Sequence, residues 1–410
     1  MRRAIPSQSA VGASQTPAAG ASWGALLSYG FRPFFLLAAG WAALTLLTLV
    51  GAFVLGAWPA GALPLARWHG HEMLFGFVAA TIAGFLLTAV PAWTGSRAVS
   101  GFPLAALAAL WLAGRAAMSP WLKLQGTPWL LLDVAFFPAL AVALAVPLVR
   151  ARNYRNFQFL LILALLASAD ALFVAVQLGW LAAPPFDPLR MGVNLVMLLI
   201  VVVGGRIIPA FTRNALLKAG VRCTFTPLAW LDRACLAAAA SVVIVDIVRP
   251  DSVIAGWLAA LTAALLAVQM SRWFGHRTLR MPIVWVLHAG FLWLCVALAL
   301  KALWLLAQAP WAANWLHALT AGAFGTMTLG VMTRVALGHT GRELVVARSI
   351  AVAYVLVIAG AALRVAGPTA LPAQYVPVLA AAGALWSVAF VVFLIVYTPL
   401  LVAPRPDAAP

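Results

Sequence analysis

The stretch WHGHEMLFGFVAATIAGFLLTAVPAW (residues 68–93) decides the fold, because a long apolar run follows its polar start. A helix of about 20 apolar residues is long enough to cross a hydrocarbon core roughly 30 Å thick. Comparable runs recur from residue 31 to residue 401 of the 410-residue chain, in which 65% of residues are hydrophobic and 9% are charged. Ordinary soluble proteins carry roughly 25% charged residues. The sequence therefore predicts an all-α, polytopic integral membrane protein.

Pro, Gly and charged residues divide the apolar runs into about twelve predicted transmembrane helices. Their expected limits are 31–56, 69–93, 101–118, 129–149, 157–179, 190–210, 230–248, 252–271, 282–305, 312–336, 346–367 and 374–401. We expect a single transmembrane domain over residues 23–403 and a short cytoplasmic C-terminal tail at 404–410. Residues 1–22 lack the apolar core of a signal peptide and are predicted to form a disordered cytoplasmic tail.

The formal net charge of +17 does not indicate a nucleic-acid partner, because the basic residues lie singly or in small groups between apolar spans. They concentrate on alternate connections, at 150–155, 213–222, 272–280 and 342–348. By the positive-inside rule, these connections and both termini face the cytoplasm. The start of the second span then faces the opposite side of the membrane.

An internal repeat links the second, sixth and tenth spans, which end alike in a ring, a Thr and an Arg. These endings are WTGSR (93–97), FTR (211–213) and HTGR (339–342). In the second and tenth spans, His71, Gly76, Gly84 and Gly95 share their spacings with His317, Gly322, Gly330 and Gly341. The four-helix offset favours three arcs of four helices, as in the main subunit of haem-copper oxidases. Chance similarity between Gly-rich apolar helices is the alternative.

The histidines are the candidate metal ligands, because imidazole ligates haem iron and copper, and ionisable groups within a membrane indicate function. On a regular helix His69 and His71 point about 200° apart and cannot ligate one metal together. Either His69 belongs to a non-helical entry, or the two histidines serve different partners. His71 and His317, expected at similar depth, are the favoured haem ligands, with Gly76, Gly322 and Gly325 leaving space for a flat macrocycle. Two interfacial histidines on separate faces are the alternative.

Other polar groups offer further sites. His69, with Glu72 or Met73 beside it, is the copper candidate, since thioether favours Cu(I); a hydrogen bond that orients the ring is the alternative. His288 and His339 form a second predicted site. His339 is equally compatible with capping a helix C-terminus.

Arg206 and Asp170 complete the predicted groups. Arg206 is expected either to pair a haem propionate or another acidic group, or to extend its side chain to the membrane interface. Asp133, Asp170 and Asp246 lie within predicted spans and form either a proton path or structural pairs.

Five stretches carry a family resemblance: GFRPFF (30–35), WHGHEMLFGF (68–77), PAWTG (91–95), GGRIIPAFT (204–212), and GTMTLGVMTR (325–334) with HTG (339–341). In these stretches the chain resembles the NnrS family. The resemblance implies a bacterial inner-membrane protein of about twelve helices that contains haem and copper. It also implies a role in the response to nitric oxide, often alongside denitrification.

The leading hypothesis is a metalloprotein whose haem iron binds nitric oxide, with copper close enough to assist electron transfer or chemistry. The expected small-molecule partner is nitric oxide or an iron-nitrosyl species. If it is an enzyme, quinol or a cytochrome supplies electrons, Asp170 delivers protons and Arg206 pairs a haem propionate. One alternative is a secondary transporter that exports a metal or a nitrosylated compound. Another is a non-catalytic sensor or assembly protein in the same membrane.

Overall fold

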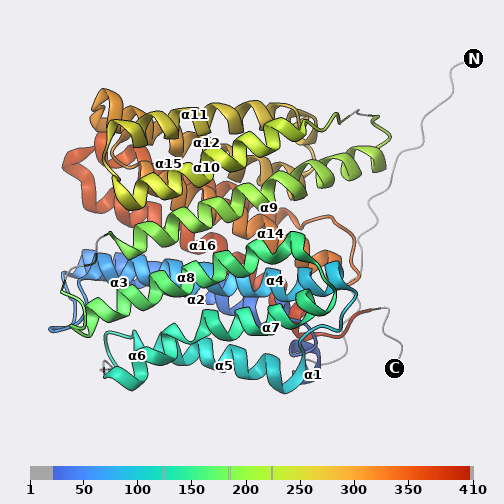
Figure 1. Cartoon of the computed structure of the whole chain (residues 1–410), viewed down its shortest axis with the longest axis horizontal. Helices are drawn as coiled ribbons and strands as arrows, with labels where there is room; N and C mark the ends of the chain where they lie inside the picture. The colour runs from blue at the N-terminus through green and yellow to red at the C-terminus, as the bar shows by residue number, and fades with distance from the viewer. Residues whose placement is uncertain are drawn as a thin grey trace, which may run out of the picture.

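The computed structural model describes residues 22–122, 124, 126–182, 184, 186–222 and 225–406. These residues form helices and connections without a β-strand, and the helices run side by side along the long axis of the molecule (Figure 1). The all-α prediction is confirmed. The predicted N-terminal tail lies almost wholly outside the described residues, as do the last four residues of the C-terminal tail.

Every predicted span is helical, with limits close to those expected. The helices are α2 (Phe31–Leu55), α3 (Leu65–His71) with π-helix η1 (Glu72–Val78) and α4 (Ala79–Thr94), α5 (Gly101–Ala117), α6 (Thr127–Val134) with α7 (Phe136–Arg150), α8 (Phe157–Gln177), α9 (Pro188–Lys218), α10 (Ala229–Val248), α11 (Val253–Ser271), α12 (Pro282–Ala307), α13 (Trp315–His317) with π-helix η5 (Ala318–Phe324) and α14 (Gly325–His339), α15 (Arg348–Ala370) and α16 (Tyr375–Val402).

Nine helical segments of the described chain are long and apolar enough to cross a membrane. The other three predicted spans are α5, α10 and the segment from α13 to α14. Helix α5 is apolar but has only 17 residues, and α10 carries Asp232, Arg233 and Asp246. The described part of the chain is therefore that of a polytopic membrane protein.

Two spans change from α-helix to π-helix immediately after a histidine. Helix η1 follows His71, and η5 follows His317. π-helical turns are rare and are frequently found at functional sites. Because each π-helix begins one residue after a histidine of the repeat, the structure supports the repeat between the second and tenth spans. The arrangement of the helices in three arcs stays a prediction.

Gly76, Gly322 and Gly325 accommodate tryptophans. A Cβ atom added at Gly76 would lie 2.6 Å from the Trp41 ring, at Gly322 2.6 Å from Trp293, and at Gly325 2.6 Å from Trp386. Indole rings lie beside these three glycines, and the space for a macrocycle stays a prediction.

The two ends of the described chain meet at one end of the bundle, called here the terminal end. The Ser22 N–H donates to the carbonyl of Val402 over 3.1 Å. The buried Arg32 donates to the carbonyls of Leu401 and Ala403 over 2.7 and 2.6 Å. The first and last described residues therefore lie at one end of the bundle; the side of the membrane that each terminus occupies stays a prediction.

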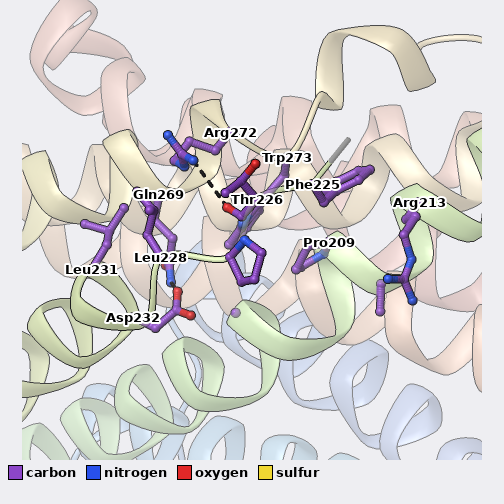
Figure 2. Close-up of a pocket in the computed structure, with 13 residues that line it drawn as sticks. Pro209, Arg213, Phe225, Thr226, Leu228, Leu231, Asp232, Gln269, Arg272 and Trp273 are labelled. Carbon is purple, nitrogen blue, oxygen red and sulfur yellow. Dashed lines mark hydrogen bonds between the residues drawn. The ribbon is translucent and has the colours of Figure 1, made fainter. Parts of the chain in front are cut away.

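Two hollows lie along α9. An apolar groove runs between α4, α9 and α14, so the three helices of the proposed repeat meet. A polar cavity of about 270 Å³ lies nearer the terminal end, between α9, α10 and α11 (Figure 2). In its wall, Gln269 donates to Asp232 over 2.7 Å and Arg272 donates to the carbonyl of Thr226 over 3.2 Å.

Candidate functional site

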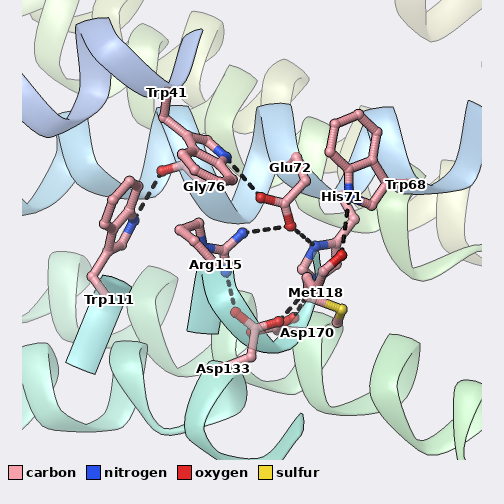
Figure 3. A network of polar contacts seen from close by, with 10 residues as sticks. All are labelled: Trp41, Trp68, His71, Glu72, Gly76, Trp111, Arg115, Met118, Asp133 and Asp170. Atoms are coloured by element: carbon pink, nitrogen blue, oxygen red, sulfur yellow. Dashed lines mark hydrogen bonds and ion pairs between the residues drawn. The ribbon is translucent and has the colours of Figure 1, made fainter. Parts of the chain in front are cut away.

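His71 lies at the centre of a buried polar cluster at the end of the bundle opposite the terminal end (Figure 3). Its Nδ1 lies 3.0 Å from Glu72 Oε1, and its Nε2 lies 3.1 Å from both Asp133 Oδ2 and Asp170 Oδ1. None of these four side chains is more than 2% exposed. We call these residues, with Arg115, the His71 cluster. Helices α3, η1, α5, α6 and α8 each contribute one member.

Arg115 bridges two carboxylates of the His71 cluster. Its Nη1 donates to Glu72 Oε1 over 2.8 Å, and its Nη2 donates to Asp133 Oδ1. Trp41 Nε1 donates to Glu72 Oε2 over 2.7 Å. Buried charges are costly unless they are paired and hydrogen-bonded. These hydrogen bonds fix the position of Glu72. The cluster contains three carboxylates but only one guanidinium.

Two glycines allow the side chains and helices of the His71 cluster to pack closely together. A Cβ at Gly76 would lie 3.1 Å from Arg115 Nη1, in addition to its clash with Trp41. A Cβ at Gly114 would lie 2.7 Å from Asp133 Oδ1 and 3.0 Å from Asp133 Cα. Only glycine at these positions lets the neighbouring side chains and helices approach so closely.

His69 belongs to a different polar group from His71. Helix α3 runs unbroken through both residues, so His69 does not lie in a non-helical entry, and the assignment of the two rings to different ligands stays a prediction. His317 interacts electrostatically with Arg364 and with His69, and Arg364 also acts on His69. The buried Nδ1 of His69 has no hydrogen-bond partner among the described residues. Arg364 is held in place by Asn314, whose Oδ1 accepts from its Nη1 over 3.2 Å.

A comparison with protein-family models matches residues 25–405 to the family described as NnrS protein. The chain belongs to the NnrS family. A search of curated proteins gave no match. The family resemblance expected from the sequence is confirmed, and it supports a role in the response to nitric oxide.

In this NnrS chain, the neighbours of His69, His71 and His317 differ from those predicted. Both ring nitrogens of His71 face carboxylates, and it is His69 that interacts with His317. Glu72 bonds His71, Arg115 and Trp41 rather than His69. Met73 packs, partly buried, against the hydrophobic core. The helix packing that sets these neighbours cannot be read from spacing along one helix; the ligand roles themselves stay predictions.

His288 and His339, the second predicted site, have different neighbours in the structure. His288 Nε2 lies 2.9 Å from Thr212 Oγ1, whereas the His339 ring lies 5.8 Å from the rings of Tyr29 and Phe31. None of His288, His339 and Arg206 lines the polar cavity of Figure 2. Arg206 is exposed and donates to Asn156 over 3.3 Å, which agrees with extension to the interface.

Sequence reasoning missed the buried cations of the NnrS chain. Arg115 was not recognised as a partner of the in-span carboxylates, nor was Lys301, which bonds Asp246 and is 1% exposed. Both lie within predicted spans, where a cation requires a partner. The need for an acidic partner is the sequence signal for these two cations, because Asp133 and Asp246 lie within other predicted spans and are available to pair with them.

Proposed function

We propose that this chain is a haem- and copper-binding protein of the bacterial inner membrane that handles nitric oxide at a site built on His69 and His317. The observation that carries the proposal is that these two histidines, on helices far apart in the sequence, lie near enough to interact electrostatically. A buried ring nitrogen without a partner is costly, and the unpartnered His69 Nδ1 is relieved by ligation.

The donor set fits the proposed groups. Two imidazoles can ligate haem iron or copper, and Arg364 is a suitable partner for an anionic group such as a haem propionate. When bound, haem iron supplies affinity for a diatomic gas, and copper supplies one-electron chemistry. The His71 cluster lies two residues further along the same helix, so proton-holding groups, Asp170 among them, adjoin the site.

The proposal predicts that His69→Ala and His317→Ala lose bound haem or copper, because each removes a ligand. The measurement is the Soret absorbance and the copper content of detergent-purified protein from haem- and copper-replete cells. His276→Ala is the matched control, since His276 is exposed in a connection. Wild-type protein without either group, or unchanged contents in both variants, would contradict the proposal. Loss in His71→Ala with full retention in His69→Ala would favour the pair His71 and His317 instead.

Activity separates the alternatives that share this site. With a quinol or cytochrome donor, sustained anaerobic consumption of nitric oxide identifies an oxidoreductase. Readily exchanged metal without consumption identifies a transporter. Stable binding without turnover identifies a sensor or assembly protein.

A further inference from the structure

The hydrogen bond between His71 and Glu72 places a proton on one nitrogen of the His71 ring. Glu72 Oε1 already accepts from Arg115 and, as a carboxylate oxygen, has no proton to donate. The bond between Glu72 and His71 therefore requires Nδ1–H as the donor. In the neutral imidazole, the lone pair then lies on Nε2. This arrangement, a carboxylate that orients the far side of an imidazole, is the usual outer shell of a metal-binding histidine.

Nε2 of His71 faces two carboxylate oxygens. Asp133 Oδ2 and Asp170 Oδ1 each lie 3.1 Å from it, and one atom from each of the three residues lies within 4.8 Å of the others. A proton on Nε2 can form the hydrogen bond to Asp170 Oδ1. Asp133 Oδ2 is buried and receives no hydrogen bond from any described residue. Since Asp133 is only 2% exposed, this oxygen points into the cluster, where His71 Nε2 is its ion-pair neighbour.

The charges of the cluster do not balance. Glu72, Asp133 and Asp170 carry three negative charges, and Arg115 supplies one positive charge. A metal-ligating His71 is neutral, and in that form two negative charges remain in an interior where uncompensated charge is strongly unfavourable. One divalent cation among the three facing atoms removes this imbalance.

We propose that His71, Asp133 and Asp170 form a binding site for a divalent first-row metal ion, separate from the His69 and His317 site. The ligand atoms are His71 Nε2, Asp133 Oδ2 and Asp170 Oδ1. Adjacent ligands of a six-coordinate ion with bonds of about 2.1–2.2 Å lie about 3.0–3.1 Å apart, which matches the two separations from Nε2.

The surroundings of the site are those of a fixed metal centre. Arg115 occupies Asp133 Oδ1 and so leaves Oδ2 to face His71. Trp41 and Arg115 both hold Glu72, which orients the imidazole. One imidazole and two carboxylates form a hard donor set that favours Mn²⁺, Fe²⁺ or Zn²⁺ over Cu(I).

The test uses the full chain, purified in detergent and depleted of loosely held metal with a chelator. Binding of Mn²⁺ is measured by loss of the free-ion electron paramagnetic resonance signal, and binding of Zn²⁺ by metal analysis after gel filtration. We expect one saturable divalent ion per chain. Asp133→Asn and Asp170→Asn, which keep the side-chain shape, should weaken binding at least about 10-fold, because removing even an outer partner has effects of that order.

Two controls make the outcome specific. Asp251→Asn removes an exposed carboxylate, 72% exposed in its side chain, and should bind like the wild type. His69→Ala should also keep the divalent ion, so this site can fail or stand independently of the proposed haem and copper site. Absence of saturable binding in the wild type, unchanged binding in both cluster variants, or equal weakening in Asp251→Asn would overturn the proposal.

Discussion

At the scale of single residues, the smallest side chains control the most polar site. Trp41 reaches Glu72 only because Gly76 has no Cβ, and α5 approaches Asp133 only because Gly114 has none. A helical glycine normally costs up to about 1 kcal/mol relative to alanine. At these two positions that cost is offset by contacts which no other residue permits.

Gly114→Ala should therefore destabilise the protein by about 1–3 kcal/mol, the usual cost of overpacking. The new methyl group would meet the backbone of Asp133 at 3.0 Å, which a side-chain rotation cannot relieve. Thermal unfolding of the detergent-solubilised protein measures the effect. Gly40→Ala is the control, because nothing lies within 4 Å of its added Cβ in α2. Equal stability of the two variants would show that the close approach at Gly114 is not required.

At the scale of helices, buried ion pairs join neighbouring spans. Lys301 on α12 bonds Asp246 on α10, and Asn194 on α9 donates to the same carboxylate oxygen over 2.9 Å. The Lys301 Nζ also lies 4.7 Å from the centre of the Trp315 ring, two residues before His317. The pair therefore fixes three helices next to the start of the tenth span.

Lys301→Met should destabilise the protein by about 3–5 kcal/mol, because it leaves Asp246 as an unpaired buried charge. The double variant Lys301→Met with Asp246→Asn should recover most of this loss, since no buried charge then remains. Arg249→Met removes an exposed cation and should change stability by no more than about 0.5 kcal/mol. Thermal unfolding compares all three variants. A double variant no more stable than Lys301→Met would contradict the charge argument.

At the scale of the whole molecule, Arg32 and the bond between Ser22 and Val402 bring the two described chain ends together. The basic connections follow the fourth, sixth, eighth and tenth spans, which are predicted to run toward the cytoplasm. Charge and fold therefore agree that the terminal end is a single face of the protein.

Reporter fusions test which side of the membrane that face occupies. Green fluorescent protein at the C-terminus should fluoresce, because the terminal end is predicted to be cytoplasmic. Alkaline phosphatase fused after residue 60 should be active, and fused after residue 151 it should be inactive. The reverse pattern of phosphatase activity would show that the charge asymmetry has been assigned to the wrong side.

The sequence by itself determined the helices and their approximate limits, such as 252–271 for the helix Val253–Ser271. It could do so because a backbone in lipid must satisfy its hydrogen bonds within each segment, so apolar length is sufficient information. The separation of His69 from His71 also followed from helix geometry alone.

Only the tertiary structure decided the partners of those histidines. Asp133 and Asp170 reach His71 from two other helices, and His317 lies near His69 rather than His71. Each pairing depends on how helices rotate and pack against one another, and that packing depends on glycines such as Gly76 and Gly114. Spacing along one helix fixes directions around its own axis, but it carries no information on which neighbouring helix lies in each direction.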